Sequence, residues 1–185
     1  ARAARCGILA RRTATAATLG ANDPHRARCQ LRLRLNAAPP RGGLPAPRLE
    51  RVRWADFLGR LAAQVAVRID PLPAAAVAAF APAQLSQVLI NLVKNAHESG
   101  GSAEAVELGL RRIGADWRLE VRDRGSGMSD AVLAQALLPF YSTKRHGTGL
   151  GLALTRDIIE AHGGHISLQN REGGGLWVSL ILPAR

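Results

Sequence analysis

The chain has 185 residues, of which 47% are hydrophobic and 4% aromatic, and it carries a formal net charge of +11. This length and composition suit one well-buried globular domain with additional segments. No run approaches about 18 uninterrupted apolar residues, and no signal peptide is readable at the start. We therefore expect no membrane span and a cytoplasmic location, which leaves a membrane-anchored parent protein open. Cys6 and Cys29, the only cysteines, indicate neither a zinc site nor a disulfide framework.

The positive charge is concentrated at the N-terminal end. Residues 1–60 contain 13 arginines and three acidic residues, a net charge of +10, whereas residues 61–185 have a net charge of +1. The arginines are not interleaved with aromatic residues and form no reading motif, so nucleic-acid binding is not indicated. Residues 1–47 are rich in Ala, Arg and Pro and are interpreted as a linker or a truncated remnant. Residues 48–185 are then the folded domain.

From residue 49 onward, hydrophobic periodicity predicts a mixture of helices and strands. The predicted helices, the third of them short, are residues 54–65, 82–99, 129–137 and 149–162. The predicted strands are residues 65–69, 74–80, 104–112, 117–123, 165–170 and 175–182. The glycines in residues 171–175 join the last two strands as a hairpin. Helices with a mostly antiparallel sheet predict an α+β fold, a two-layer α/β sandwich.

Three local patterns carry chemistry, and the first is NLVKNAHES on the longest predicted helix. Asn91, Asn95 and Glu98 lie at i, i+4 and i+7, on the flank of an apolar stripe. An asparagine side-chain oxygen can ligate a hard cation such as Mg²⁺. Taken alone, the pattern is more simply explained by amides on a helix surface.

The second pattern is VRDRGSGMSD, which places Asp123 at the end of a predicted strand. A carboxylate there can accept a hydrogen bond from an exocyclic amine. Gly125 and Gly127 allow the backbone to approach a flat base closely. A simple turn with the same spacing is the alternative, and it is common.

The third pattern is YSTKRHGTGLGLAL, a glycine-rich segment that opens a helix. Backbone N–H groups around Gly147, Gly149 and Gly151 can hold phosphate oxygens, with Lys144 and Arg145 just before them. The segment lacks the Lys-Ser/Thr of a P-loop, and it follows an irregular loop rather than a strand, unlike a dinucleotide fingerprint. A glycine-rich helix start is about as often a packing device.

In this order, with a Phe-containing loop between the last two, the patterns resemble the N, G1, F and G2 boxes of the histidine-kinase ATPase domain. That family shares the Bergerat fold with gyrase-type, heat-shock-90-type and mismatch-repair ATPases. The resemblance covers roughly residues 48–183 and is closest over 84–182. Three segments are similar in sequence to segments of the sensor kinases of two-component systems, particularly the nitrogen-regulation-like group: QVLINLVKNAHES, PFYSTKRHGTGLGLAL and IIEAHGGHISLQN.

The resemblance implies a role for each matching residue. Asn95 would coordinate Mg²⁺, and Asn91 would stand where gyrase-like relatives carry a water-activating glutamate, which an amide cannot replace as a base. Asp123 would bind the adenine amino group, with Gly125 and Gly127 shaping its surroundings. Ser179 would support that aspartate from the last strand.

The resemblance also implies a mobile ATP lid over residues 128–147. Phe140 would be the F-box residue, and Lys144 and Arg145 would be candidates to touch the γ-phosphate. The residues that resemble the G2 box over the phosphates are Gly147, Thr148, Gly149, Leu150 and Gly151.

The implied function is binding of Mg-ATP and transfer of its γ-phosphoryl group to a histidine on a separate dimerisation domain. The implied partners are that domain and the receiver domain of a response regulator. The chain itself has no recognisable acceptor motif, because His25 follows a proline and precedes no acidic residue. Two alternatives stay open: a serine kinase of the anti-sigma-factor type, and a non-catalytic ATP-binding or docking module.

Overall fold

A computed structural model of the chain describes residues 46–102, 105–144 and 147–184. The predicted basic segment of residues 1–47 thus lies almost wholly outside the described residues. The helices are α2 (Trp54–Ala62), α3 (Pro82–His97), α4 (Asp130–Gln135) and α5 (Gly151–Ala161). The strands are β1 (Glu50–Arg53), β2 (Arg68–Ile69), β3 (Val77–Phe80), β4 (Glu107–Ile113), β5 (Asp116–Arg122), β6 (His165–Asn170) and β7 (Leu176–Pro183).

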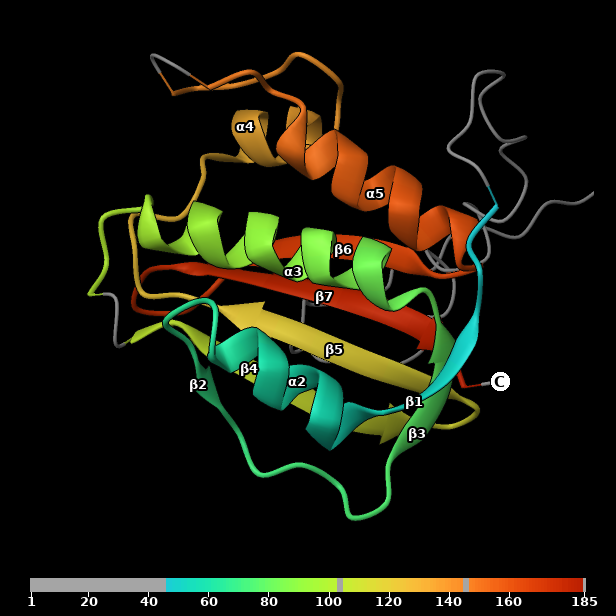
Figure 1. The fold of residues 1–185 in the computed structure, drawn as a ribbon. Coiled ribbons are helices and arrows are strands. Elements are labelled where there is room, and N and C mark those ends of the chain that lie inside the picture. The colour runs from blue at the N-terminus through green and yellow to red at the C-terminus, as the bar shows by residue number, and fades with distance from the viewer. Residues whose placement is uncertain (1–45, 103–104, 145–146, 185) are drawn as a thin grey trace, which may run out of the picture. The chain divides into compact units, whose positions relative to one another are not determined.

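Five strands form one sheet in the order β2-β4-β5-β7-β6. The β2–β4 pair is parallel, and the other three pairs are antiparallel. A separate two-stranded ribbon pairs β1 with β3. Helices α2, α3 and α5 lie on one face of the five-stranded sheet (Figure 1). The predicted two-layer α+β sandwich with a mostly antiparallel sheet is confirmed.

Helix α3 is the central helix of the helical layer, and one apolar stripe fixes it against the sheet. The stripe residues are each at most 4% exposed: Leu85, Val88, Leu89, Leu92, Val93 and Ala96. Alternate residues of β5 and β7, including Leu119 and Leu180, are buried in the same core. Burial of each Leu or Val side chain contributes about 1.5–3 kcal/mol relative to exposure. The polar flank of α3 is therefore held in a fixed orientation.

An aromatic cluster fixes α2 over the end of the sheet. The Trp54 ring lies 4.6 Å from the Phe80 ring and 6.2 Å from the Trp117 ring, between ring centroids. Phe57 packs edge-on against Phe80 at 5.0 Å. These contacts join α2 to β3 and β5, so the short helix is held by packing rather than by its own propensity.

The structure differs from the predicted elements mainly at their ends. Helix α2 ends at Ala62, three residues before the predicted end, and α5 begins at Gly151. Helix α3 ends at His97 because the Ser99 hydroxyl bonds the Ala96 carbonyl at 2.7 Å and Gly100 adopts a φ of 90°. Strand β1 was not predicted, since its mostly exposed residues show no alternation. Across the described residues, no helix has the length and apolarity needed to cross a membrane.

Candidate functional site

A cavity of about 750 Å³ lies between α3, the start of α5 and the segment that connects β5 to α5. Most of the predicted site residues line it: Asn91, Asn95, Asp123, Gly127, Lys144, Gly147, Thr148, Gly149 and Gly151. The fold thus brings residues of all three sequence patterns to one place. Arg145 lies outside the described residues.

Asp123 lines the cavity directly after β5, and it is 5% exposed. One carboxylate oxygen, Oδ1, accepts three hydrogen bonds: from the Gly125 N–H at 2.8 Å, the Leu176 N–H at 3.1 Å and the Ser99 hydroxyl at 3.2 Å. Within the described part of the chain, Oδ2 has no hydrogen-bond donor. The carboxylate is therefore fixed through one oxygen and can accept a ligand's donor through the other.

The predicted supporter of Asp123, Ser179, is placed elsewhere. Ser179 is paired with Glu120 across β5 and β7, and directly opposed residues share a face of the sheet. That face is opposite to the one on which Val121 and Val178 line the cavity, and Ser179 does not line it. The site therefore excludes Ser179. Its predicted contact is made instead by Ser99 and by the backbone of Leu176.

Neither of these supporting residues was predicted, for different reasons. Ser99 follows Asn95 by four residues, so its presence beside the α3 pattern was a readable signal. Leu176 contributes only its main-chain N–H, and Asp123 N–H in turn donates to the Leu176 carbonyl at 3.0 Å. A main-chain contact of this kind does not depend on the side chain, so the residue type cannot indicate it.

A cationic group from the loop before α5, the Lys144 ammonium, also lines the cavity. The Lys144 ammonium donates to the Asn95 amide oxygen at 3.2 Å and to the Glu98 carboxylate at 2.5 Å. The hydrogen bond from Lys144 lowers the pKa of the Glu98 carboxyl, although partial desolvation opposes this. The Asn91 amide oxygen accepts a long bond of 3.4 Å from Gln87. Helix α3 thus presents amide and carboxylate oxygens to a cation.

The glycine-rich segment also lines the cavity, through Gly147, Gly149 and Gly151. Gly149 has a φ of 68°, and a Cβ there would lie 2.4 Å from the Phe140 carbonyl carbon, so only glycine fits. Gly151 begins α5, and a Cβ there would meet no atom within 4 Å. The first N–H groups of a helix lack intrahelical partners, so this end can bind an anion.

Three predicted residues border the cavity without lining it. Phe140 is 79% exposed and adopts a φ of 62°, with its backbone against Gly149. Leu150 is 43% exposed. Gly125 lies against Ser99, and its contribution is the main-chain bond to Asp123.

Comparison with known proteins gives the family. The family described as histidine kinase-, DNA gyrase B- and HSP90-like ATPase matches residues 81–185. This match covers more than half of the chain, so the chain belongs to that family of ATPases. Its relatives are, more particularly, the sensor histidine kinases, including a nitrogen regulation protein.

Three relatives illustrate the match. The C4-dicarboxylate transport sensor protein DctS of Rhodobacter capsulatus is 42% identical over 103 residues, which are 54% of this chain and 16% of DctS. The sensor histidine kinase ZraS of Escherichia coli K12 is 38% identical, over 55% of this chain and 22% of ZraS. The nitrogen regulation protein NtrY of Azorhizobium caulinodans is 36% identical, over 73% of this chain and 18% of NtrY. The chain thus spans about a fifth of each relative.

Solved structures agree on the fold. The catalytic domain of the histidine kinase ThkA superposes with a TM-score of 0.66 at 24% identity, covering 74% of this chain and 96% of that domain. The ATP-binding domain of PrrB from Mycobacterium tuberculosis gives a TM-score of 0.62 at 28% identity, covering 74% of this chain and 98% of that domain. Both match nearly their whole length, so the matched part of this chain corresponds to one such domain.

Proposed function

We propose that residues 48–185 bind Mg-ATP and transfer its γ-phosphoryl group to a histidine on a separate dimerisation domain, as the catalytic part of a two-component sensor histidine kinase. The observation that carries this proposal is Asp123, fixed through Oδ1 in the lining of a cavity that the N-terminus of α5 also lines. Such a cavity suits a ligand that carries both an amine and an anionic group.

Asp123 selects the base. Its Oδ2 accepts the exocyclic amine of adenine, while the three donors on Oδ1 prevent the carboxylate from turning away. Gly127, with a φ of 68°, lets the chain turn beside the base without a side chain in the cavity. Gly125 contributes its main-chain N–H to the Asp123 carboxylate and does not line the cavity.

Asn95 is the residue that holds Mg²⁺. The fit rests on its amide oxygen, which already accepts from a cation, the Lys144 ammonium. The described residues contain no cluster of three or more His, Cys, Asp or Glu side chains that could hold a metal ion. Mg²⁺ keeps several waters and takes few protein oxygens beside the substrate's phosphate oxygens, so one amide oxygen fits this pattern. Bound Mg²⁺ supplies charge neutralisation on the phosphates.

The remaining residues position the triphosphate. The N–H groups from Gly147 to Gly151 and the start of α5 bind phosphate oxygens. Lys144 and Arg145 neutralise charge near the γ-phosphate, which is most of what phosphoryl transfer requires from the protein. Asn91 cannot act as a general base, so water is not activated and ATP is kept for the histidine. The receiver domain of a response regulator then takes the phosphoryl group.

Calorimetric titration of Mg-ATP into this chain tests the proposal. Asp123→Asn keeps an oxygen for the three donors but presents an amide to the base, so the fold is expected to be retained and ATP binding to be strongly weakened. Asn95→Ala is expected to remove the Mg²⁺ dependence. Asp116→Asn, at the far end of β5, is the control and binds as the parent does. Equal affinities for the parent and Asp123→Asn would contradict the base assignment.

A second measurement tests the reaction class. With a histidine-containing dimerisation domain supplied in trans, the phosphorylated product is expected to be lost in acid, because phosphohistidine is acid-labile. An acid-stable product would indicate a serine kinase. Binding of Mg-ATP without any transfer would indicate a non-catalytic module.

A further inference from the structure

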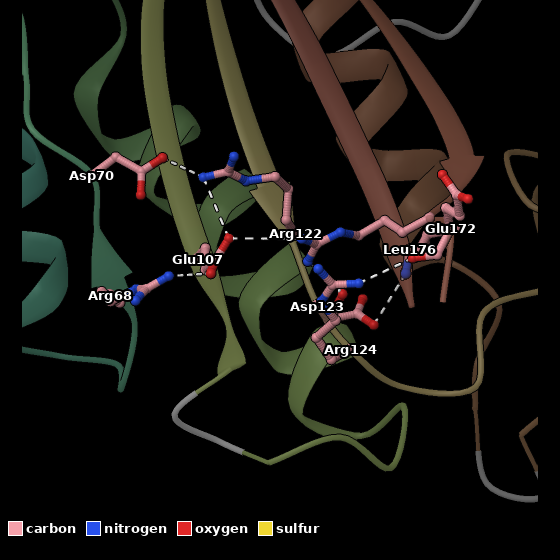
Figure 2. Close-up of polar contacts among 9 residues, drawn as sticks. Arg68, Asp70, Glu107, Arg122, Asp123, Arg124, Glu172 and Leu176 are labelled. Carbon is pink, nitrogen blue, oxygen red and sulfur yellow. Dashed lines mark hydrogen bonds and ion pairs between the residues drawn. The ribbon is translucent and has the colours of Figure 1, made fainter. Parts of the chain in front are cut away.

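The turn between β6 and β7 lies directly against the loop that carries Asp123. The side-chain amide of Asn170 pairs with both main-chain groups of Met128, accepting from its N–H at 2.9 Å and donating to its carbonyl at 2.6 Å. On the same loop, the Arg124 guanidinium donates to the Glu172 carbonyl at 3.1 Å. Figure 2 shows Arg124, Glu172 and Leu176 gathered around Asp123. The turn is therefore a support for this loop.

Asp123 itself is bonded by Arg171 in this turn and by Leu176 at the start of β7. The Leu176 N–H bonds its carboxylate, as described above, and the Arg171 guanidinium donates to its main-chain carbonyl at 2.8 Å. Gly175, with a φ of 99°, allows this approach, because a Cβ there would lie 2.1 Å from the Asp123 carbonyl oxygen. The Asp123 carbonyl is thus in close contact with the Gly175 backbone and accepts a hydrogen bond from the Arg171 guanidinium.

Arg171 is in turn held by a group of charges on the adjacent strands. Its Nη2 lies 3.9 Å from a Glu107 carboxylate oxygen. Glu107 also pairs with Arg68 and, at 3.5 Å, with Arg122, which pairs with Asp70 (Figure 2). The Arg171 guanidinium therefore serves two partners at once, through different nitrogens. A lysine ammonium lacks this planar fork.

We propose that Arg171 is a positioning residue for base recognition: braced by Glu107, it fixes the Asp123 carbonyl and so aims the Asp123 carboxylate into the cavity. This inference rests on the proposed role of Asp123 as the acceptor for the adenine amine. Arg171 touches neither the base nor the phosphates in this assignment. A change at Arg171 consequently alters which base is preferred, more than how the triphosphate binds.

Binding of Mg-ATP and Mg-inosine triphosphate, compared by calorimetry on the full chain, tests this role. The two ligands differ in the base, where inosine has a carbonyl in place of the amine, and share the triphosphate. Arg171→Met is expected to reduce the preference for ATP about tenfold, the effect of losing one hydrogen bond to a charged group. Arg112→Met, at the opposite end of β4 from Glu107, removes the same charge far from Asp123 and is expected to keep the parent's preference.

Two further variants make the outcomes distinguishable. If Asp123→Asn leaves the preference for ATP unchanged, the proposed base assignment fails, and this inference fails with it. If Asp123→Asn abolishes the preference but Arg171→Met does not, only this inference fails. Equal weakening of both ligands by Arg171→Met also overturns it, since that is a purely structural effect. Should Arg171→Met not fold, Arg171→Lys decides: the preference falls at least about threefold without the guanidinium fork, and full retention overturns the role.

Discussion

Lys144 and Glu98 form an ion pair inside the region that the proposed function assigns to Mg²⁺ and the phosphates. The Lys144 ammonium bonds both Glu98 and Asn95, so it occupies an oxygen that the metal requires. The Glu98 carboxylate also repels a triphosphate. Binding of Mg-ATP must therefore displace Lys144 from Asn95 and overcome this repulsion.

Glu98→Gln is accordingly expected to tighten Mg-ATP binding about threefold, within the range of about 1 kcal/mol for an exposed ion pair. The substitution weakens the hold on Lys144 and removes the negative charge. Calorimetric affinities of the parent and the variant at equal ionic strength measure the effect. Glu160→Gln, on the exposed side of α5, is the charge-matched control. Weaker binding by Glu98→Gln would mean that Glu98 helps to hold the metal.

The same pair predicts a pH dependence of stability. Lys144 lowers the pKa of Glu98 below its ordinary value of 4.5. A carboxyl with a depressed folded-state pKa stabilises the fold above pH 4.5, and this contribution is lost as the pH falls through the folded-state pKa. The difference in unfolding free energy between the parent and Glu98→Gln is thus expected to shrink between pH 5 and pH 3 in urea titrations. The full difference is at most about 1 kcal/mol, because the pair is exposed. A constant difference over that range would argue against the pair.

Among the elements, α3 and α5 are joined by a buried histidine. His162, 5% exposed at the end of α5, accepts the Ala81 N–H at 3.1 Å through Nε2. Its Nδ1 bonds the Ile158 carbonyl at 2.7 Å, which assigns the proton to Nδ1 in the neutral ring. The start of α3 is thereby tied to the end of α5. The two helices that line the cavity keep their spacing partly through this ring.

His162→Leu is therefore expected to lower the unfolding free energy by about 1–3 kcal/mol, because it leaves a buried N–H without its acceptor. Chemical denaturation followed by circular dichroism measures the loss. His97→Leu, at the end of α3 and bonded to the Ala66 carbonyl at an exposed position, is a suitable comparison with a smaller loss. Equal losses in the two variants would show that the Ala81 contact contributes little.

Some helices and strands could be predicted from the sequence, and others could not. The stripe of α3 and the alternation of β5 and β7 are periodic, so both the elements and their buried faces were predictable. Strand β1 pairs with residues 24 to 30 positions further along the chain, and its own sequence pattern does not indicate that partner. Asp123 and Asn95 stand in recognisable spacings, and the fold brings them to one cavity. Ser179 was assigned to Asp123 without the register of β7, which turns its side chain to the other face.

For the whole molecule, the uneven charge distribution gives the last prediction. Residues 1–47 carry nine arginines and one acidic residue, a net charge of +8, so residues 48–185 carry +3 of the total of +11. Every described helix and strand begins at or after Glu50. Removing residues 1–47 should therefore leave the thermal unfolding midpoint and, at 0.15 M salt, the affinity for Mg-ATP close to those of the full chain.

At low salt the two chains are expected to differ. Interactions between exposed charges are largely screened beyond about 8 Å at 0.15 M ionic strength, but only beyond about 30 Å at 0.01 M. At low salt the additional net charge of +8 is therefore expected to attract the ATP anion to the full chain. Calorimetry at both salt concentrations should then show a steeper salt dependence for the full chain than for residues 48–185. Unfolding of the shortened chain, or loss of its ATP binding at 0.15 M salt, would mean that residues 1–47 belong to the folded domain rather than preceding it.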